Sequence, residues 1–205
     1  MVPLLPALIG CSTLGVLMFL ITAALGLNNS LGRLPGLGWN SDYCQSCSRA
    51  NGFQNEAFIM SIADAFVDMG FQKLGYRYIN MDASWDTPKR DADGDLQPNP
   101  ALWPSGIQAT IDYVHGRGLG FGLYGDKGSK DCAKNPGQQG HVARDAAFLA
   151  RHKIDFFKED SCYSSGTHAQ QIADYAKMRD ALNATGRPIW FALYACGLNH
   201  GPRGC

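Results

Sequence analysis

Polar side chains that could take part in chemistry lie at the ends of three predicted strands. Asp82 follows one apolar run, Tyr124 and Asp126 end the next, and Lys158 and Asp160 end a third. Residues two positions apart on a strand point to the same face of a sheet. Because carboxylates and a lysine within apolar strands cost free energy unless they are paired or used, the pattern favours an enzyme site. The alternative is that Lys158 and Asp160 form only a structural ion pair.

The apolar pattern predicts five strands that alternate with four helices. Helices are expected where apolar residues recur every three or four positions, and strands where short apolar runs lie between turn residues. The expected strands are residues 36–39, 76–82, 119–124, 154–158 and 189–194, and the expected helices are residues 55–69, 107–117, 142–152 and 169–183. This alternation indicates parallel βαβ units in which helices cover the sheet.

The predicted strand ends indicate a barrel, because (β/α)-barrel enzymes carry their chemistry at the carboxyl ends of the strands. A doubly wound sheet is the alternative, since its ligands bind at the same ends, but no phosphate-binding glycine motif follows the first strand. The ends at Trp39, Asp82, Asp126, Asp160 and Tyr194 are about 34 to 44 residues apart, whereas a whole barrel averages roughly 31 residues per unit. We therefore expect an α/β fold, a (β/α)8 TIM barrel truncated to about its first five βα units, from a fragment or a truncated gene product.

Residues 1–26 contain no charged side chain and include a long apolar run. We expect a secretory signal peptide there, with a mature start near Leu27. An uncleaved signal anchor is the alternative, because the stretch is long enough to cross a bilayer. Residues 27–205 are then expected to form the incomplete barrel.

The composition limits the classes of function. A hydrophobic content of 45% with 18% charged residues excludes whole-chain disorder. The formal net charge is zero and no dense basic run occurs, so neither nucleic acid nor an anionic membrane is expected as a partner. The histidines are scattered. The segment that begins at Asp91 has Leu96 at its sixth position and Leu102 at its twelfth, where a calcium loop needs glycine and glutamate, so no metal or other cofactor is expected.

Six cysteines remain when Cys11 is removed with the leader, an even number that suits an oxidising compartment. About fifteen pairings are possible, and sequence alone does not choose among them. Three pairs would close loops without crossing, namely Cys44/Cys47, Cys132/Cys162 and Cys196/Cys205. Sequons at Asn28 and Asn183 predict a glycoprotein.

Four segments resemble glycoside hydrolase family 27, the family of α-galactosidases and α-N-acetylgalactosaminidases. They are Leu27 to Ser41, Tyr78-Ile-Asn-Met-Asp82 with Trp85, Gly122-Leu-Tyr-Gly-Asp126, and Asp155-Phe-Phe-Lys-Glu-Asp-Ser-Cys162. The resemblance runs from residue 27 to about residue 197, with the motifs in the family's order. It implies a (β/α)8 barrel followed by an antiparallel β-domain, so that this chain lacks units six to eight and the C-terminal β-domain.

The resemblance also implies roles for individual residues. Asp160 matches the catalytic nucleophile of this retaining family, and Lys158 matches a donor to a galactose hydroxyl. Asp82 matches a carboxylate that accepts from sugar hydroxyls, while Trp39 and Tyr124 match residues that line the sugar pocket. The general acid/base is implied at the end of the sixth strand, beyond Cys205, so the 205-residue chain itself is expected to be inactive.

The same resemblance implies a pairing for two cysteines, and the sequence differs from the family's motifs at two places. Cys132 and Cys162 match a family disulfide beside the nucleophile. The family's Asp-Asp-Cys-Trp becomes Asp82-Ala83-Ser84-Trp85, which removes a sugar-binding carboxylate and the usual partner of Cys44, and so favours a Cys44/Cys47 bridge. The family's Cys-Glu-Trp becomes Cys196-Gly197-Leu198, which removes a glutamate that recognises the sugar.

The expected function is a retaining, exo-acting α-galactosidase-like hydrolase that removes terminal α-linked galactose, or a related sugar, from oligosaccharides or glycoconjugates. The alternative is a non-catalytic or vestigial secreted carbohydrate-binding relative, which Ala83 and Gly197 favour. We expect a secreted or lysosomal/vacuolar protein that has no membrane contact after leader cleavage and forms a homodimer at full length.

Overall fold

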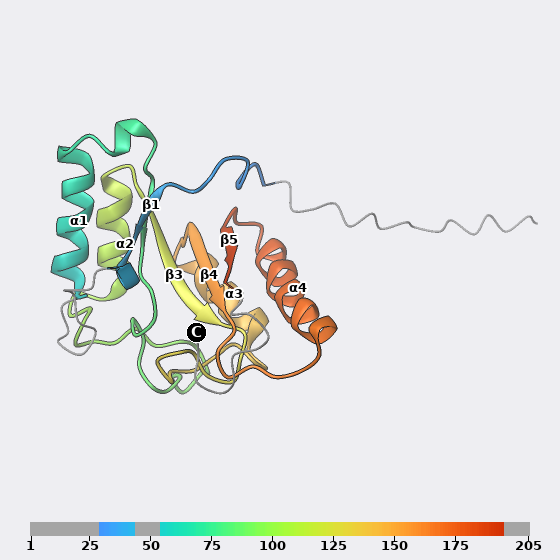
Figure 1. Cartoon of the computed structure of the whole chain (residues 1–205). Coiled ribbons are helices and arrows are strands. Elements are labelled where there is room, and N and C mark those ends of the chain that lie inside the picture. Colours follow the sequence, from blue (N-terminus) through green and yellow to red (C-terminus); the bar gives the residue numbers. More distant parts are fainter. Residues whose placement is uncertain (1–28, 44–53, 195–205) are drawn as a thin grey trace, which may run out of the picture.

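The computed structural model of the protein describes residues 29–43 and 54–194. Its strands are β1 (Gly38–Asn40), β2 (Tyr78–Asn80), β3 (Gly120–Asp126), β4 (Phe156–Asp160) and β5 (Trp190–Leu193). Its helices are α1 (Glu56–Asp68), α2 (Ile107–Gly116), α3 (Val142–Arg151) and α4 (His168–Ala184), and short 3-10 turns occur at η1 (Ser41–Tyr43) and η3 (Gln72–Leu74). Strands and helices alternate as the sequence predicts (Figure 1).

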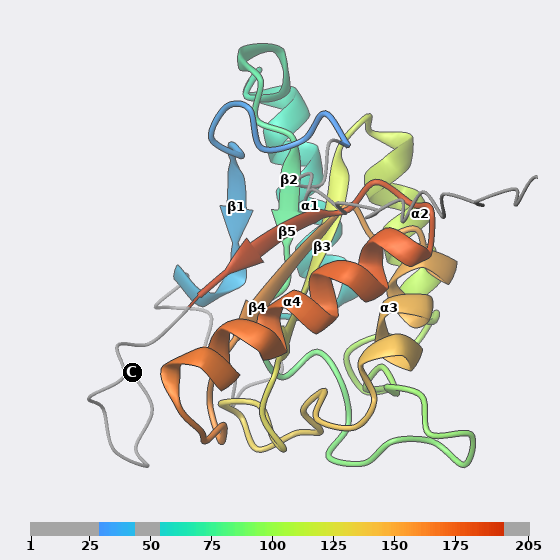
Figure 2. The ribbon, with the colours of Figure 1, turned by 90° about the vertical axis from the view of Figure 1, so that its right-hand side faces the viewer.

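The five strands form one parallel sheet in the order β1-β2-β3-β4-β5. Each right-handed crossover therefore moves in the same direction, which places the helices on one side of the sheet. A doubly wound sheet would reverse its strand order and carry helices on both faces. Helices α1 and α2 lie beside one end of the sheet and α4 beside the other (Figures 1 and 2). The fold is a partial (β/α) barrel, as expected.

Alternate residues of each strand divide the sheet into two faces. The ladder aligns Ile79 with Phe121, and Leu123 with Phe157, and all four are buried in the core that packs against the helices. The helices contribute buried residues to that core, among them Ile59 and Ala63 of α1, Ile111 of α2, Leu149 of α3 and Met178 of α4.

The opposite, inner face of the sheet carries an aromatic layer below the polar strand ends. The Tyr78 ring lies 5.4 Å from that of Phe156 and 5.9 Å from that of Trp190, measured between centroids. Gly122 lies on the same face, where a Cβ atom would overlap the Asn80 side chain. The glycine therefore leaves room for its neighbours on the inner face.

Helix boundaries agree with the sequence prediction to within one residue, because the apolar spacing that predicts them is a local signal. Asn55 caps α1 by accepting a hydrogen bond from the Phe58 backbone N–H at 3.0 Å. Thr167 and Gln170 form a capping box at the start of α4.

Strand boundaries differ more from the prediction. Strands β3 and β4 extend through Asp126 and Asp160, the residues expected at their ends, and so continue two residues beyond the apolar runs. The reason is that backbone pairing continues through these polar residues, with Asp126 opposite Asp160. The predicted strand 76–82 is shorter in the structure, at Tyr78–Asn80.

In the described residues, no helix combines the length and apolar character needed to cross a membrane.

Candidate active site

The carboxyl ends of β2, β3 and β4 bring five of the predicted polar residues together. The ladder pairs Tyr124 with Lys158 and Asp126 with Asp160, so these side chains form adjacent rows on the inner face. Asp82 lies two residues beyond β2 and contacts Lys158. Residues far apart in the sequence thus form one polar cluster.

Lys158 lies at the centre of this cluster. Its Nζ donates a hydrogen bond to Asp82 Oδ2 at 2.7 Å, and the Asp82 side chain is only 4% exposed. The same ammonium lies 5.2 Å from the centroid of the Tyr124 ring and 5.0 Å from that of Tyr194. A cation held between a carboxylate and two aromatic rings has its position well defined.

The direct ion-pair partner of Lys158 is therefore Asp82, whereas the structural alternative raised from the sequence paired Lys158 with Asp160. Residues two positions apart on a strand are separated by about 7 Å along it, which is too far for a direct ion pair without bending of the side chains. The long lysine side chain instead reaches past β3 to Asp82.

Asp160 is the last residue of β4 and is buried. Its Oδ1 accepts a hydrogen bond from the Ser161 backbone N–H at 2.7 Å, and its Oδ2 accepts one from the Tyr124 hydroxyl at 3.1 Å. Burial raises the pKa of Asp160, and the two hydrogen bonds and the charge of Lys158 oppose that rise. The two donors hold this buried carboxylate in one orientation at the end of β4.

Tyr124 is buried and acts as a donor to Asp160. Burial and the negative charge of Asp160 raise the pKa of its hydroxyl far above the usual range, so the hydroxyl keeps its proton. Its backbone carbonyl accepts a hydrogen bond from the Trp85 indole N–H at 2.9 Å. This contact links the loop after β2 to strand β3.

The turn after β2 positions Asp82. Its Oδ1 accepts from the Ala83 backbone N–H at 2.9 Å, and its own backbone N–H donates to Ser41 Oγ at 2.9 Å. Ala83 is buried, and Ser84 has a left-handed backbone with φ of 77°. Sequence analysis missed Ser41, because a single hydroxyl in a predicted turn has no distinctive pattern.

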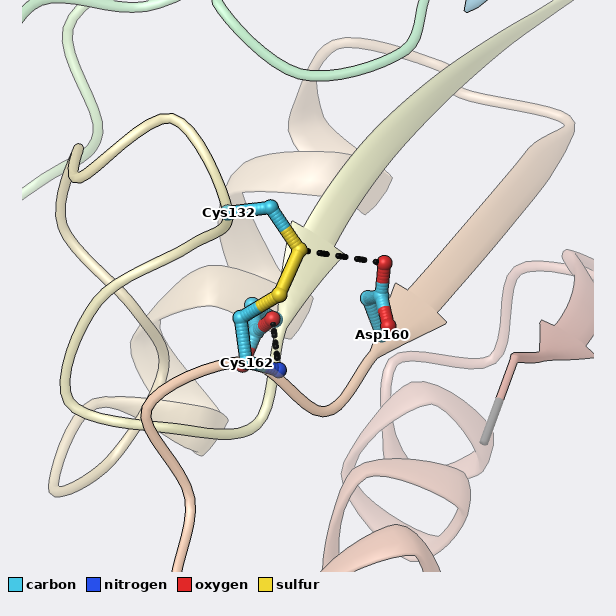
Figure 3. A group of neighbouring side chains, drawn as sticks. Cys132, Asp160 and Cys162 are labelled. Atoms are coloured by element: carbon cyan, nitrogen blue, oxygen red, sulfur yellow. Dashed lines mark hydrogen bonds between the residues drawn. A yellow bond between two sulfur atoms is a disulfide. The ribbon is translucent and has the colours of Figure 1, made fainter. Parts of the chain in front are cut away.

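The Cys132–Cys162 disulfide is confirmed. It joins the loops after β3 and β4, with a Cα–Cα distance of 5.3 Å and a sequence separation of 30. The sulfur of Cys132 lies 3.4 Å from Asp160 Oδ2 (Figure 3). Because a disulfide sulfur carries no proton, this is a packing contact against the carboxylate.

Trp39, another predicted site residue, lies on β1. Its ring packs edge-on against Phe58 of α1, with centroids 5.9 Å apart, and the ladder aligns it with the core residue Ile79. Its described contacts are thus with the helix layer, and its role at the sugar stays a prediction. Cys44, Cys47, Cys196, Gly197 and Cys205 lie outside the described residues.

Asp126, Cys132, Asp160 and Cys162 place one potential ligand atom each within 4.8 Å of one another. Both sulfur atoms are bonded to each other in the disulfide, so neither is available as a thiolate ligand. This group therefore fits a metal ion poorly.

Residues 34–200 match a protein-family model described as "Alpha galactosidase A". The chain is 42% identical over 175 residues to alpha-galactosidase 3 of Arabidopsis thaliana, covering 85% of this chain and 38% of that protein. It is also 42% identical over 176 residues to an alpha-N-acetylgalactosaminidase of Gallus gallus, covering 83% of this chain and 42% of that protein.

The fold is similar to that of an alpha-galactosidase from Saccharomyces cerevisiae solved with raffinose. The TM-score is 0.76 at 34% identity, and the match covers 82% of this chain and 37% of that one. The chain thus spans about two fifths of the length of the relatives it matches.

Proposed function

Because the chain belongs to the alpha galactosidase A family, glycoside hydrolase family 27, we propose that it carries the nucleophile side of a retaining exo-α-galactosidase site. The substrates would be oligosaccharides or glycoconjugates that end in α-linked galactose or a related sugar. The observation that carries this proposal is Asp160, buried at the end of β4 and held by Tyr124 and Ser161 beside the Lys158–Asp82 pair.

In the proposed reaction, an Asp160 oxygen attacks the anomeric carbon and the bond to the leaving oxygen breaks. A second carboxylic acid protonates that oxygen and then activates the water that hydrolyses the glycosyl-enzyme ester. Among the described residues, Asp126 does not fit that second role, because both of its oxygens accept backbone hydrogen bonds. The family resemblance implies the acid/base at the end of a sixth strand.

The Lys158–Asp82 pair is proposed to bind sugar hydroxyls. An ammonium donates to hydroxyl oxygens and a carboxylate accepts from hydroxyl protons, so the pair offers both functions at one edge of the site. Hydrogen bonds to charged groups contribute about 1.5–3 kcal/mol each. Loss of this pair should therefore weaken sugar binding strongly.

The test is made on a protein that contains this chain together with the rest of the catalytic domain. A 2-fluoro-galactoside with a good leaving group should label Asp160, as found by peptide mass spectrometry. Asp160→Asn should abolish hydrolysis of 4-nitrophenyl α-galactoside without unfolding the protein, while the exposed control Asp180→Asn should keep it. Labelling of another carboxylate would refute the assignment.

A non-catalytic carbohydrate-binding protein is the second candidate. It is favoured by the buried Ala83 beside Asp82, where the family resemblance implies another carboxylate. Galactose binding by calorimetry, without turnover or labelling, would support this candidate over the hydrolase.

We also propose that the protein passes through the secretory pathway, to be secreted or delivered to a lysosome or vacuole. The Cys132–Cys162 disulfide and the exposed Asn183 sequon support this proposal. The predicted leader, residues 1–26, lies outside the described residues. Intact-mass analysis of protein from a eukaryotic host should show a start near Leu27 and a glycan on Asn183; a retained leader would contradict it. Homodimer formation stays a prediction.

A further inference from the structure

We propose that Asp126 is a positioning residue for the nucleophile, because its carboxylate ties the loop after β3 to the loop that follows Asp160. The proposal rests on the proposed function, since it concerns the rate at which Asp160 reacts.

Asp126 is the last residue of β3 and is fully buried. Its Oδ1 accepts a hydrogen bond from the Gly128 backbone N–H at 2.7 Å, and its Oδ2 accepts one from the Cys162 backbone N–H at 2.6 Å. The Cys162 amide lies two residues after the nucleophile, and Asp126 is the ladder partner of Asp160. One carboxylate therefore holds the loop after β3 against the loop that follows Asp160.

Further contacts make the two loops a single unit. The Lys127 backbone N–H donates to the Asp160 carbonyl at 3.2 Å, and the Ser129 backbone N–H donates to the Tyr163 carbonyl at 3.3 Å. A Cβ atom on Gly128 would overlap the Cys162 carbonyl oxygen, so the loops approach closely. The disulfide adds a covalent link between the same loops.

A carboxylate is suited to this position in a way that an amide is not. Two backbone donors point at its two oxygens, whereas an asparagine would direct its own N–H group at one of these donors. Burial raises the pKa of Asp126 to about 7, and the charges of Asp160 and Asp131 add to that rise, while the bonds from Gly128 and Cys162 oppose it. Lys127 and Glu159 are further titratable neighbours that interact with it.

The test compares Asp126→Asn with the control Asp180→Asn in a protein that contains this chain and the rest of the catalytic domain. Asp180→Asn makes the same chemical change at an exposed position on α4, where the carboxylate pairs with Arg179. The measurement is the first-order rate constant for labelling by the 2-fluoro-galactoside, per folded site, together with the concentration at half-maximal rate.

Asp126→Asn should lower the labelling rate constant about 100-fold with little change in the half-maximal concentration, because a misplacement of about 1 Å has an effect of that size. Asp180→Asn should leave the rate constant unchanged. Only the folded fraction, isolated by size exclusion, is counted, and Asp126→Glu serves as a second variant that keeps both acceptors. It should also react slowly, because its longer side chain displaces the Cys162 amide.

An unchanged rate constant in either folded Asp126 variant would overturn the positioning role. If the unsubstituted protein labels at another residue, the proposed function fails instead, so the two failures are distinguishable.

Discussion

Replacing Glu159 by glutamine should stabilise the protein at neutral pH. Glu159 is fully buried on the helix-facing side of β4, and neither carboxylate oxygen has a hydrogen-bond partner among the described residues. Burial, with the charges of Asp126 and Asp174, raises the pKa of Glu159 to about 9, and Lys127 opposes the rise. The folded protein therefore holds Glu159 as a neutral acid at pH 7.

The magnitude follows from the difference between the folded and unfolded states. An unfolded chain loses this proton near pH 4.5, whereas the folded chain keeps it up to a pKa of about 9. The contribution of Glu159 to stability is therefore highest below pH 4.5 and falls as the pH rises from there towards 9, because over that range ionisation of Glu159 favours only the unfolded state. At about 1.4 kcal/mol per pH unit, the loss at pH 7 is about 3 kcal/mol. Glutamine does not ionise and escapes that loss.

The assay is urea unfolding at pH 5, 6, 7 and 8, followed by tryptophan fluorescence. The Glu159→Gln variant should gain stability relative to the unsubstituted protein as the pH rises. Glu56→Gln is the matched control, because it makes the same chemical change at a partly exposed position. Equal pH dependence in the Glu159→Gln variant and the unsubstituted protein would refute the reasoning.

Three further predictions concern the site and its loops. Lys158→Met should raise the KM for 4-nitrophenyl α-galactoside about 10- to 100-fold through loss of charged hydrogen bonds, whereas Lys177→Met, at an exposed lysine, should not; an unchanged KM would remove Lys158 from the binding site. Joint replacement of Cys132 and Cys162 by serine should lower the free energy of unfolding by about 2–4 kcal/mol, and an unchanged urea midpoint would contradict this. Gly128→Ala should cost about 1–3 kcal/mol in the same urea assay because its Cβ meets Cys162, whereas Gly116→Ala, which meets open space, should be neutral or favourable.

The helices and the strand order could be predicted because their signals are local. Apolar residues that recur every three or four positions mark the helices, and the alternation of elements with regular spacing indicates a barrel. The alternation of side chains along a strand also predicts that Tyr124, Lys158 and Asp160 lie on one face, as they do. These predictions need only the chain geometry within one element.

Other features depend on contacts between elements, which sequence does not give. The alternation of side chains could not show that Lys158 pairs with Asp82, because that contact depends on the positions of β2 and β4 on the two sides of β3. The backbone amides of Gly128 and Cys162, which donate to Asp126, lie in loops, and loop conformation leaves no periodic pattern in the sequence. Glu159 could be placed on the core face, but its lack of a partner among the described residues is visible only in the structure.

Side chains along β4 point alternately to the site and to the helices, so substitutions at neighbouring positions harm the protein in different ways. Lys158 and Asp160 face the site, whereas Phe157 and Glu159 face the helices. A harmful substitution at a helix-facing position lowers the amount of folded protein, and a small molecule that binds the folded site restores that amount by mass action. Under the proposed function, a substitution of Asp160 that keeps the fold removes the nucleophile, and no such molecule repairs that loss.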